Sequence, residues 1–270
     1  MPVSERTRVS DSWASGRSYE AYVGGWSRLV AAEFVAWLAV PPGGRWLDVG
    51  SGTGALTEAV LVRCAPEQVV GVEPSAAFRE YARIHVPDPR AEFRAGEAQS
   101  LPVEDDAFDV VVSGLVLNFV PDRTAALTEM RRAARVGGTV AAYVWDYPGE
   151  MQLMRHFWEA AVALDPGALS LDEGARFEFC RPAPLRGLFT TAGLEDVDVR
   201  PIVVPTDFPD FDSYWTPFLG GTGTAPAYAM SLGEPDRAAL RDALRVRLPA
   251  AGDGSIHLTA RAWAVRGTVG

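Results

Sequence analysis

The middle of the chain alternates between short apolar runs and segments in which apolar residues recur at helical spacing. Runs such as FDVVVSG at 108–114 are typical of strands that are buried on both faces of a sheet. The strands predicted in this way cover residues 45–50, 68–73, 90–96, 108–114 and 139–146. The helices predicted between them cover residues 55–64, 75–85 and 122–135. This alternation predicts an α/β fold with a doubly wound, mostly parallel sheet.

The pattern changes after residue 146, where irregular stretches such as 164–180 separate the remaining elements. The elements predicted here are helices at 151–163 and 234–247, a short helix that ends at Gly193, and strands at 195–204 and 255–267. We expect the last two strands to form a hairpin that extends the sheet to seven strands, with the final strand antiparallel. Residues 205–250, rich in aromatic residues, Gly and Pro in their first half, then form a lid inserted before that strand.

Residues 11–40 are predicted to form a helical cap in front of the first strand. Apolar residues recur at helical spacing on the C-terminal side of Gly24 and Gly25, which indicates a helix, a glycine hinge and a second helix. The PPGG segment at 41–44 ends the second helix. With 270 residues and 48% hydrophobic composition, the chain is long enough for a single domain with one large core.

Composition narrows the classes of function. The net charge is −10 and no cluster of basic residues is present, which disfavours nucleic acid as a partner. Cys64 and Cys180 are far apart and have no metal-binding or disulfide spacing, so no metal is expected. Neither an apolar leader nor a run of about 18 apolar residues is seen, so we expect a cytoplasmic protein with no membrane span, as a monomer or homodimer.

The segment RWLDVGSGTGALTEAV at 45–60 places three glycines directly after a predicted buried strand. Glycines at such a turn allow a ligand to approach the backbone closely, and GSGTGA also fits the pattern G-x-G-x-x-A of dinucleotide-binding loops. Glu73 follows Gly50 by 23 residues, the spacing of an acid that binds ribose hydroxyls. Asp48 precedes the glycines, where its charge disfavours a pyrophosphate and favours a cationic ligand.

These motifs together resemble the class I S-adenosylmethionine-dependent methyltransferases, especially those that act on small molecules. The resemblance rests on LDVGSGTG, GVEPS and AGEAQSLPVEDDAFDVVVSGLVLNFVPD, and it covers residues 45–145. It implies a Rossmann-like fold, S-adenosylmethionine as the methyl donor and S-adenosylhomocysteine as the product. No N-P-P-Y-type motif follows the strand at 108–114, which disfavours methylation of nucleic acid bases and favours a small-molecule acceptor.

The resemblance also implies roles for residues of this sequence. Asp48 and the loop Gly50, Ser51 and Gly52 are expected beside the methionine part of the cofactor, and Glu73 beside the ribose. It further implies Glu97 and Ala98 at the adenine, and Ser113 and Gly114 beside the transferable methyl group. Apart from the resemblance, Trp26 and Pro74 are candidates for the cofactor site, and Arg28 is a candidate bidentate donor to the cofactor carboxylate, with a surface arginine on a helix as the alternative. For Asp48 and Glu73 a capping or turn role remains an alternative, and Ser113 is equally compatible with a backbone contact.

Aromatic and polar residues outside these motifs are candidates for the acceptor site. The substrate-binding candidates are Tyr19, Tyr22, Asn118, Trp145, Trp215 and Phe218, and further cavity aromatics are Phe119, Phe211, Tyr214 and Tyr228. Asp146, His156 and Tyr22 are candidate catalytic groups, needed only if the acceptor must lose a proton. Core packing remains the alternative for the aromatic residues.

The expected reaction is transfer of a methyl group to an O, N or C atom of an apolar or aromatic small molecule, for example an indole in natural-product tailoring. Two other functions stay open. An NAD-dependent oxidoreductase would use the same glycines, but all 25 basic residues are arginine, so a Tyr/Lys pair is absent. A cofactor-binding protein without catalytic activity on the same scaffold is the second, because a fold does not determine a function.

Overall fold

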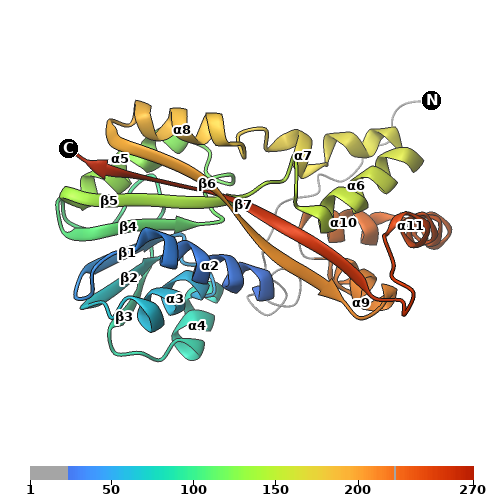
Figure 1. The fold of residues 1–270 in the computed structure, drawn as a ribbon, viewed down its shortest axis with the longest axis horizontal. Helices are drawn as coiled ribbons and strands as arrows, with labels where there is room; N and C mark the ends of the chain where they lie inside the picture. Colours follow the sequence, from blue (N-terminus) through green and yellow to red (C-terminus); the bar gives the residue numbers. More distant parts are fainter. Residues whose placement is uncertain (1–23, 222) are drawn as a thin grey trace.

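The computed structural model describes residues 24–221 and 223–270 of the chain (Figure 1). Its central feature is a seven-stranded sheet with the order β3-β2-β1-β4-β5-β7-β6. The strands are β1 (Arg45–Val49), β2 (Gln68–Val72), β3 (Ala91–Arg94), β4 (Phe108–Gly114), β5 (Ala134–Trp145), β6 (Leu194–Phe208) and β7 (Ile256–Val269). The pairs among β1 to β5 are parallel, and β7 pairs antiparallel with β5 and β6. The predicted α/β sheet with an antiparallel last strand is confirmed.

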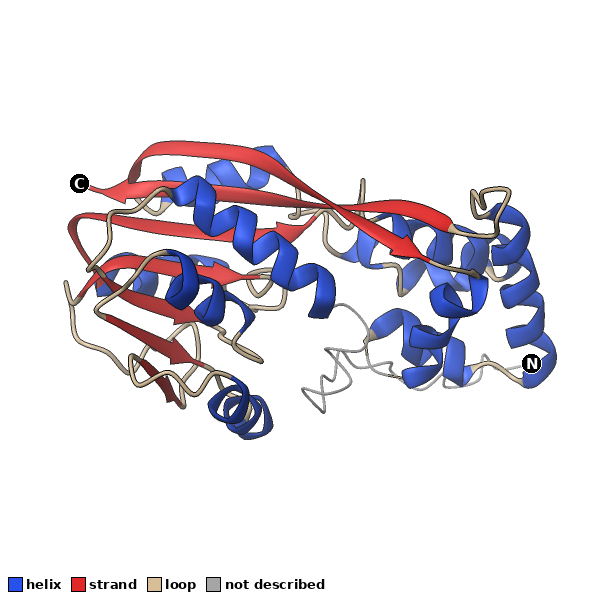
Figure 2. Cartoon of the chain, turned by 60° about the horizontal axis from the view of Figure 1, so that its bottom comes forward, coloured by secondary structure: helices blue, strands red, loops and turns tan. Residues whose placement is uncertain are grey.

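Helices cover both faces of this sheet (Figures 1 and 2). The α-helices are α2 (Gly25–Leu38), α3 (Ala55–Arg63), α4 (Ala76–His85), α5 (Arg123–Ala133), α6 (Gln152–Leu164), α7 (Glu173–Arg176), α8 (Pro182–Thr191), α9 (Phe211–Trp215), α10 (Thr224–Ser231) and α11 (Glu234–Arg247). Two 3-10 helices, η2 (Pro166–Ser170) and η3 (Thr216–Gly220), complete the described elements. The predicted second helix of the N-terminal cap is α2, and the predicted first helix lies outside the described residues.

Local sequence signals explain where several of these elements begin. Ser75 caps the N-terminus of α4 by accepting a hydrogen bond from Phe78 N, and Asp122 does the same for α5 through Ala125 N at 2.9 Å. In the centre of the sheet, Val111 and Val112 of β4 are fully buried, as expected for a strand covered by helices on both faces. The sheet is therefore the rigid platform on which the loops after its strands are placed.

Strands β6 and β7 extend beyond the parallel part of the sheet and pair with each other as far as Phe208 and Ile256. Their distal ends meet a helical lobe formed by α6, α9, η3, α10 and α11, seen at the right of Figure 1. The sequence predicted β6 shorter, at 195–204, because Pro205 interrupts the alternation of apolar and polar residues, whereas β7 was predicted at 255–267, close to its observed bounds. No described helix has both the length and the apolar character needed to cross a bilayer.

Aromatic side chains form the core of this helical lobe. Phe157 of α6 stacks on Phe218 at 4.5 Å between ring centroids, and Tyr214 and Trp215 contact Phe218 from the adjoining turns. Phe218 and Tyr214 are completely buried. Burial of these rings supplies the apolar area that holds the lobe on the strands.

Candidate functional site

The loop between β1 and α3 has a backbone that requires glycine. Gly50, Gly52 and Gly54 have φ values of 76°, 52° and 89°, in the left-handed region that side chains disfavour. A Cβ atom at Gly50 would lie 2.5 Å from the side chain of Val116, which belongs to the loop after β4. The loop therefore packs closely on its neighbour while its backbone lines a cavity.

Asp48, the last-but-one residue of β1, is a buried acid at this loop. Its side chain is 1% exposed, and its Oδ2 accepts a hydrogen bond of 2.7 Å from Thr57 Oγ1 of α3. Burial raises the pKa of Asp48 to about 7, and the nearby Glu73 carboxylate adds to this effect. A cation bound close to Asp48 would stabilise its charged form.

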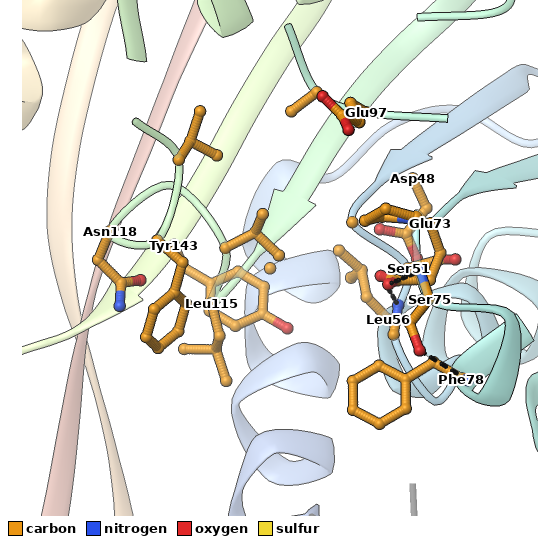
Figure 3. Close-up of a pocket in the computed structure, with 18 of the residues that line it drawn as sticks. Asp48, Ser51, Leu56, Glu73, Ser75, Phe78, Glu97, Leu115, Asn118 and Tyr143 are labelled. Atoms are coloured by element: carbon orange, nitrogen blue, oxygen red, sulfur yellow. Dashed lines mark hydrogen bonds between the residues drawn. The ribbon is translucent and has the colours of Figure 1, made fainter. Parts of the chain in front are cut away.

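Glu73 follows β2 and points back toward the glycine loop (Figure 3). Its Oε2 accepts a hydrogen bond from Gly52 N at 3.1 Å, and its Oε1 accepts one from Ser75 N at 2.8 Å. Burial raises the pKa of Glu73 above its usual range, while these two backbone donors lower it. Each carboxylate oxygen keeps a second acceptor position, so the group is oriented and still able to bind two hydroxyl groups.

A cavity of about 790 Å³ opens over the carboxyl ends of β1, β2, β4 and β5. This is the expected position of a ligand in an open α/β sheet. Among the predicted site residues, those that line it are Asp48, Gly50, Ser51, Gly52, Glu73, Pro74, Glu97, Ala98, Gly114, Asn118 and Phe119. The sequence motifs therefore converge on one cavity, although their contacts with a cofactor remain predictions.

The far side of the cavity is formed by the loop after β4 and by β5 (Figure 3). Asn118 is 3% exposed, and neither atom of its side-chain amide has a hydrogen-bond partner within the described structure. The hydroxyl of Tyr143 lies close to Gly114, where a Cβ atom would be 2.5 Å from it. Leu115, with φ 61°, begins the turn that carries Asn118 to this position.

A third wall comes from the end of α7, where Arg176 and the following residue, Phe177, line the cavity. The ring of Phe177 contacts that of Phe119 edge-on, with centroids 5.4 Å apart. The Arg176 guanidinium lies over the Phe177 ring at 5.0 Å and donates to Thr224 Oγ1 of α10 at 3.3 Å. The segment 164–180, predicted to be irregular, therefore contains a short helix that contributes to the site.

Several predicted cofactor residues lie elsewhere in the structure. Arg28 forms an ion pair with Glu58 of α3 and is not among the described residues that line the cavity. Trp26 contacts the ring of Phe208 at 5.6 Å. On α2 it is Ser27 that faces the cavity, because successive residues of a helix point about 100° apart.

Ser113 also differs from its expected position beside the cofactor. Its hydroxyl donates to Val49 O at 2.9 Å, it is completely buried, and it does not line the cavity. This is the backbone contact that the sequence left open as an alternative. Ser113 thus joins β4 to β1 beneath the site.

The predicted catalytic groups Asp146 and His156 lie outside the cavity lining. Asp146 Oδ2 accepts hydrogen bonds from Arg261 Nε at 2.8 Å and Glu150 N at 3.0 Å, which ties the end of β5 to β7. His156 lies on α6, where burial lowers the pKa of its imidazole. Neither group is thus among the described lining residues, and their catalytic role stays a prediction. Tyr22 lies outside the described residues.

The substrate-binding candidates divide in the same way. Asn118 lines the cavity, whereas Trp145 is buried at the end of β5, and Trp215 and Phe218 belong to the aromatic core of the helical lobe. Tyr19 and Tyr22 fall outside the described residues. The core packing left open for these aromatic residues is what the structure shows for Trp215 and Phe218.

Sequence reasoning missed several residues that line the cavity: Ser27, Thr53, Leu56, Ser75, Phe78, Leu115, Arg123, Tyr143, Arg176 and Phe177. Ser75 and Phe78 carried a usable signal, because they begin the helix directly after the acid of β2. Arg176 and Phe177 carried none, since α7 reaches the cavity only through the packing of α6. No group of three or more potential metal ligands occurs in the part of the chain described.

Comparison with known proteins supports the family. The methyltransferase domain model matches residues 47–142. A demethylmenaquinone methyltransferase of Roseiflexus sp. is 34% identical over 180 residues, which are 63% of this chain and 75% of that protein. A 2-methyl-6-phytyl-1,4-hydroquinone methyltransferase of Synechocystis sp. is 30% identical over 124 residues, 46% of this chain and 39% of that protein.

Solved structures show the same fold at low identity. A protein of Anabaena variabilis, given as a methyltransferase from an antibiotic biosynthesis pathway, has a TM-score of 0.61 and 22% identity over 88% of this chain and 96% of its own. Phosphoethanolamine N-methyltransferase 2 of Haemonchus contortus, solved with S-adenosylhomocysteine, has a TM-score of 0.56 and 16% identity over 94% of this chain and 56% of its own. With its glycine loop, its strand-end acids and these relatives, the chain belongs to the class I S-adenosylmethionine-dependent methyltransferases.

Proposed function

We propose that the cavity binds S-adenosylmethionine along the glycine loop and Glu73 and encloses a small apolar or aromatic acceptor beside Asn118. The observation that carries this proposal is the pair of orienting hydrogen bonds on Glu73, which present a carboxylate to the cavity at the position of a ribose-binding acid. Asp48 adds a buried acid beside the glycine loop, suited to a ligand with an ammonium or sulfonium group. The residues present therefore fit the cofactor.

The bound cofactor would supply an electrophilic methyl group on a sulfonium, and the protein has little proton chemistry to perform. Asp48 and Glu73 would hold and orient the donor, and the walls formed by Tyr143, Phe119 and Phe177 would exclude water from the acceptor. Proximity and orientation account for most of the rate enhancement in such a site. The absence of Asp146 and His156 from the described cavity lining agrees with a reaction that uses no strong protein base.

An aromatic acceptor is favoured by the lining of the cavity, in which apolar and aromatic side chains dominate beyond the strand-end acids. The names of two relatives, which act on a menaquinone precursor and a hydroquinone, point to the same chemical class. We therefore propose a ring compound with oxygen substituents ahead of an indole. A role in natural-product tailoring is compatible with this acceptor class.

The test is calorimetric titration of S-adenosylhomocysteine into wild type and Glu73→Ala. We expect micromolar binding to wild type and a loss of about 100-fold in the variant, because two hydrogen bonds to a charged group are removed. Glu67→Ala is the matched control, since Glu67 is exposed just before β2. It should bind as wild type does.

Two results would overturn the proposal or narrow it. Binding of NAD in place of S-adenosylhomocysteine would support the oxidoreductase alternative. Tight binding of S-adenosylhomocysteine without methyl transfer to any of a panel of phenols, hydroquinones, indoles and amines would favour the cofactor-binding protein without activity.

A further inference from the structure

The cavity is polarised between its two ends. Its acidic side chains are Asp48, near the end of β1, and Glu73 and Glu97, which follow β2 and β3. Its guanidinium groups belong to Arg123 and Arg176, on the side of Asn118. The two ends therefore favour ligands of opposite charge, and the acidic end is the one expected to hold a cationic methyl donor.

Side-chain contacts place both arginines at the Asn118 end. Arg123 Nη2 donates to Asn118 O at 3.2 Å, and its Nε donates to Leu117 O at 2.9 Å. Arg176 is joined to the same end through the rings of Phe177 and Phe119. Positive charge is thus fixed beside the one amide of this wall that has no partner within the described structure.

The Asn118 amide points to a ligand with a polar atom. A buried amide without a hydrogen bond costs free energy, so its donor and acceptor are expected to be used when the site is filled. Its side chain faces the cavity from the side opposite Glu73 (Figure 3). The ligand group that it contacts therefore belongs to the acceptor and not to the ribose or the adenine.

Helix α7 is held in place by buried polar contacts. Arg155 of α6 forms two hydrogen bonds with Asp172, at 2.8 and 2.7 Å, and Asp172 Oδ1 accepts from Gly174 N at 2.7 Å. Trp158 Nε1 donates to the buried carboxylate of Glu173. Arg176 and Phe177 thus approach the cavity from a fixed element, which lies outside the region matched by the family model.

No Asp, Glu or His among the described lining residues lies at the Asn118 end of the cavity. An acceptor with an ordinary alcohol would need a base there to become nucleophilic. A phenol with a low pKa needs none, because it loses its proton to water before it binds. Positive charge beside it then favours the anion.

Building on the proposed function, we propose that the acceptor is an acidic hydroxyarene bound as its phenolate. Its ring lies against Phe119 and Phe177, its oxygen accepts from the Asn118 amide, and Arg176 and Arg123 stabilise the negative charge. The phenolate oxygen, or a ring carbon conjugated with it, forms a bond to the methyl carbon as the carbon–sulfur bond breaks and its electron pair stays on sulfur. In the ring-carbon case the displaced ring proton is lost to water.

The test uses 4-nitrophenol, whose ionisation is seen in its visible spectrum, and 4-nitroanisole, which has a similar shape but cannot ionise. Both are titrated into the complex of the full chain with S-adenosylhomocysteine. We expect the phenol to bind at least about tenfold more tightly than the anisole at pH 8. We also expect bound 4-nitrophenol to ionise at a lower pH than in buffer.

Variants test whether Arg176 and Asn118 cause the tighter binding and the shifted ionisation of 4-nitrophenol. Arg176→Gln is expected to raise the pH at which bound 4-nitrophenol ionises, and Asn118→Ala to weaken its binding by about tenfold. Arg241→Gln, which removes an exposed arginine of α11, is the charge-matched control and should change neither quantity. Titration with S-adenosylhomocysteine confirms that each variant is folded and still binds the cofactor product.

The outcomes separate this proposal from the proposed function. Equal binding of phenol and anisole, an unshifted ionisation of the bound phenol, or no binding of the phenol to a complex that holds S-adenosylhomocysteine would each overturn the phenolate proposal. The proposed function would survive all three results. Failure to bind S-adenosylhomocysteine would remove the proposed function and this inference together.

Discussion

At the scale of single residues, Asp48 has the most unusual environment. An acid whose pKa rises from 3.8 to about 7 on folding binds more protons in the folded than in the unfolded state. Its stabilising contribution is complete below pH 3.8 and is lost as the pH rises through 7. In the protein without ligand, the buried Asp48 therefore favours folding at low pH.

We expect the free energy of unfolding of the ligand-free wild type to fall between pH 5 and pH 8 by more than that of Asp48→Asn. The difference is on the order of 2–4 kcal/mol, because a shift of one pKa unit corresponds to about 1.4 kcal/mol. Urea denaturation at each pH measures it. Equal pH dependence in the two proteins would show that Asp48 does not titrate in this way.

Substitution of Gly50 tests the need for glycine in the loop between β1 and α3. Gly50→Ala and Gly43→Ala both place a side chain at positive φ, 76° and 86°, but only at Gly50 would the Cβ meet a neighbour, Val116 at 2.5 Å. We expect Gly43→Ala to cost about 1 kcal/mol of stability and leave S-adenosylhomocysteine binding unchanged. Gly50→Ala is expected to weaken that binding at least about tenfold. Calorimetry on both variants compares them, and equal affinities would contradict the close approach.

The predicted residues that line the cavity share a physical reason for being found there. Asp48, Glu73 and the glycines stand at fixed offsets from strand ends, and the carboxyl ends of parallel strands meet at one edge of the sheet. Trp26 and Arg28 are outside the described lining whereas Ser27 belongs to it, because a rotation of one residue on a helix decides which side chain meets the cavity. The periodicity of apolar residues does not determine the rotation of a helix about its axis to within one residue.

At the scale of elements, α7 shows how a short helix is held by tertiary contacts. Four residues are too few for a helix that is stable by itself, so Glu173–Arg176 depends on Arg155, Asp172 and Trp158. The sequence predicted an irregular segment here because four residues are too few to show a helical period, although Asp172 is a local capping residue. The distal end of β6, which was predicted to end at residue 204, was underestimated for a related reason, since its pairing with β7 depends on the lobe that the two strands carry.

The buried pair of Arg155 and Asp172 should matter far more than an exposed one. Its side chains are 16% and 7% exposed, whereas Glu234, which pairs with Arg237, is 77% exposed. We expect Asp172→Ala to lower the free energy of unfolding by about 3 kcal/mol, because Arg155 is left buried without its partner. Glu234→Ala is expected to cost less than about 1 kcal/mol. Guanidinium denaturation measures both, and similar losses would show that the buried pair is not critical.

At the scale of the whole molecule, the sheet and the helical lobe divide two tasks. The sheet places the acids and glycines of the cavity, whereas α6 of the lobe fixes α7, which brings Arg176 to the cavity. Aromatic residues have different positions in the two parts. Phe119 and Phe177 line the cavity, whereas Trp215 and Phe218 pack in the core of the lobe. Sequence composition alone cannot separate these uses, because both place large rings in the interior.

Phe218→Ala tests this division of tasks. The ring of Phe218 is completely buried against Phe157, so its removal leaves a cavity in the lobe and should cost about 3–5 kcal/mol of stability. Phe119 is 36% exposed in the cavity wall, so Phe119→Ala should lower the free energy of unfolding by much less.

Thermal unfolding measures the stability of both variants. Calorimetry measures the binding of S-adenosylhomocysteine to each variant, and the binding of 4-nitrophenol to the complex with S-adenosylhomocysteine. We expect Phe218→Ala to keep both affinities within about twofold at a temperature where it is folded, since Phe218 is not among the described residues that line the cavity. Phe119→Ala should instead weaken 4-nitrophenol while leaving S-adenosylhomocysteine unchanged. A reversed result, with phenol binding lost in Phe218→Ala and retained in Phe119→Ala, would move the acceptor site from the sheet edge into the lobe.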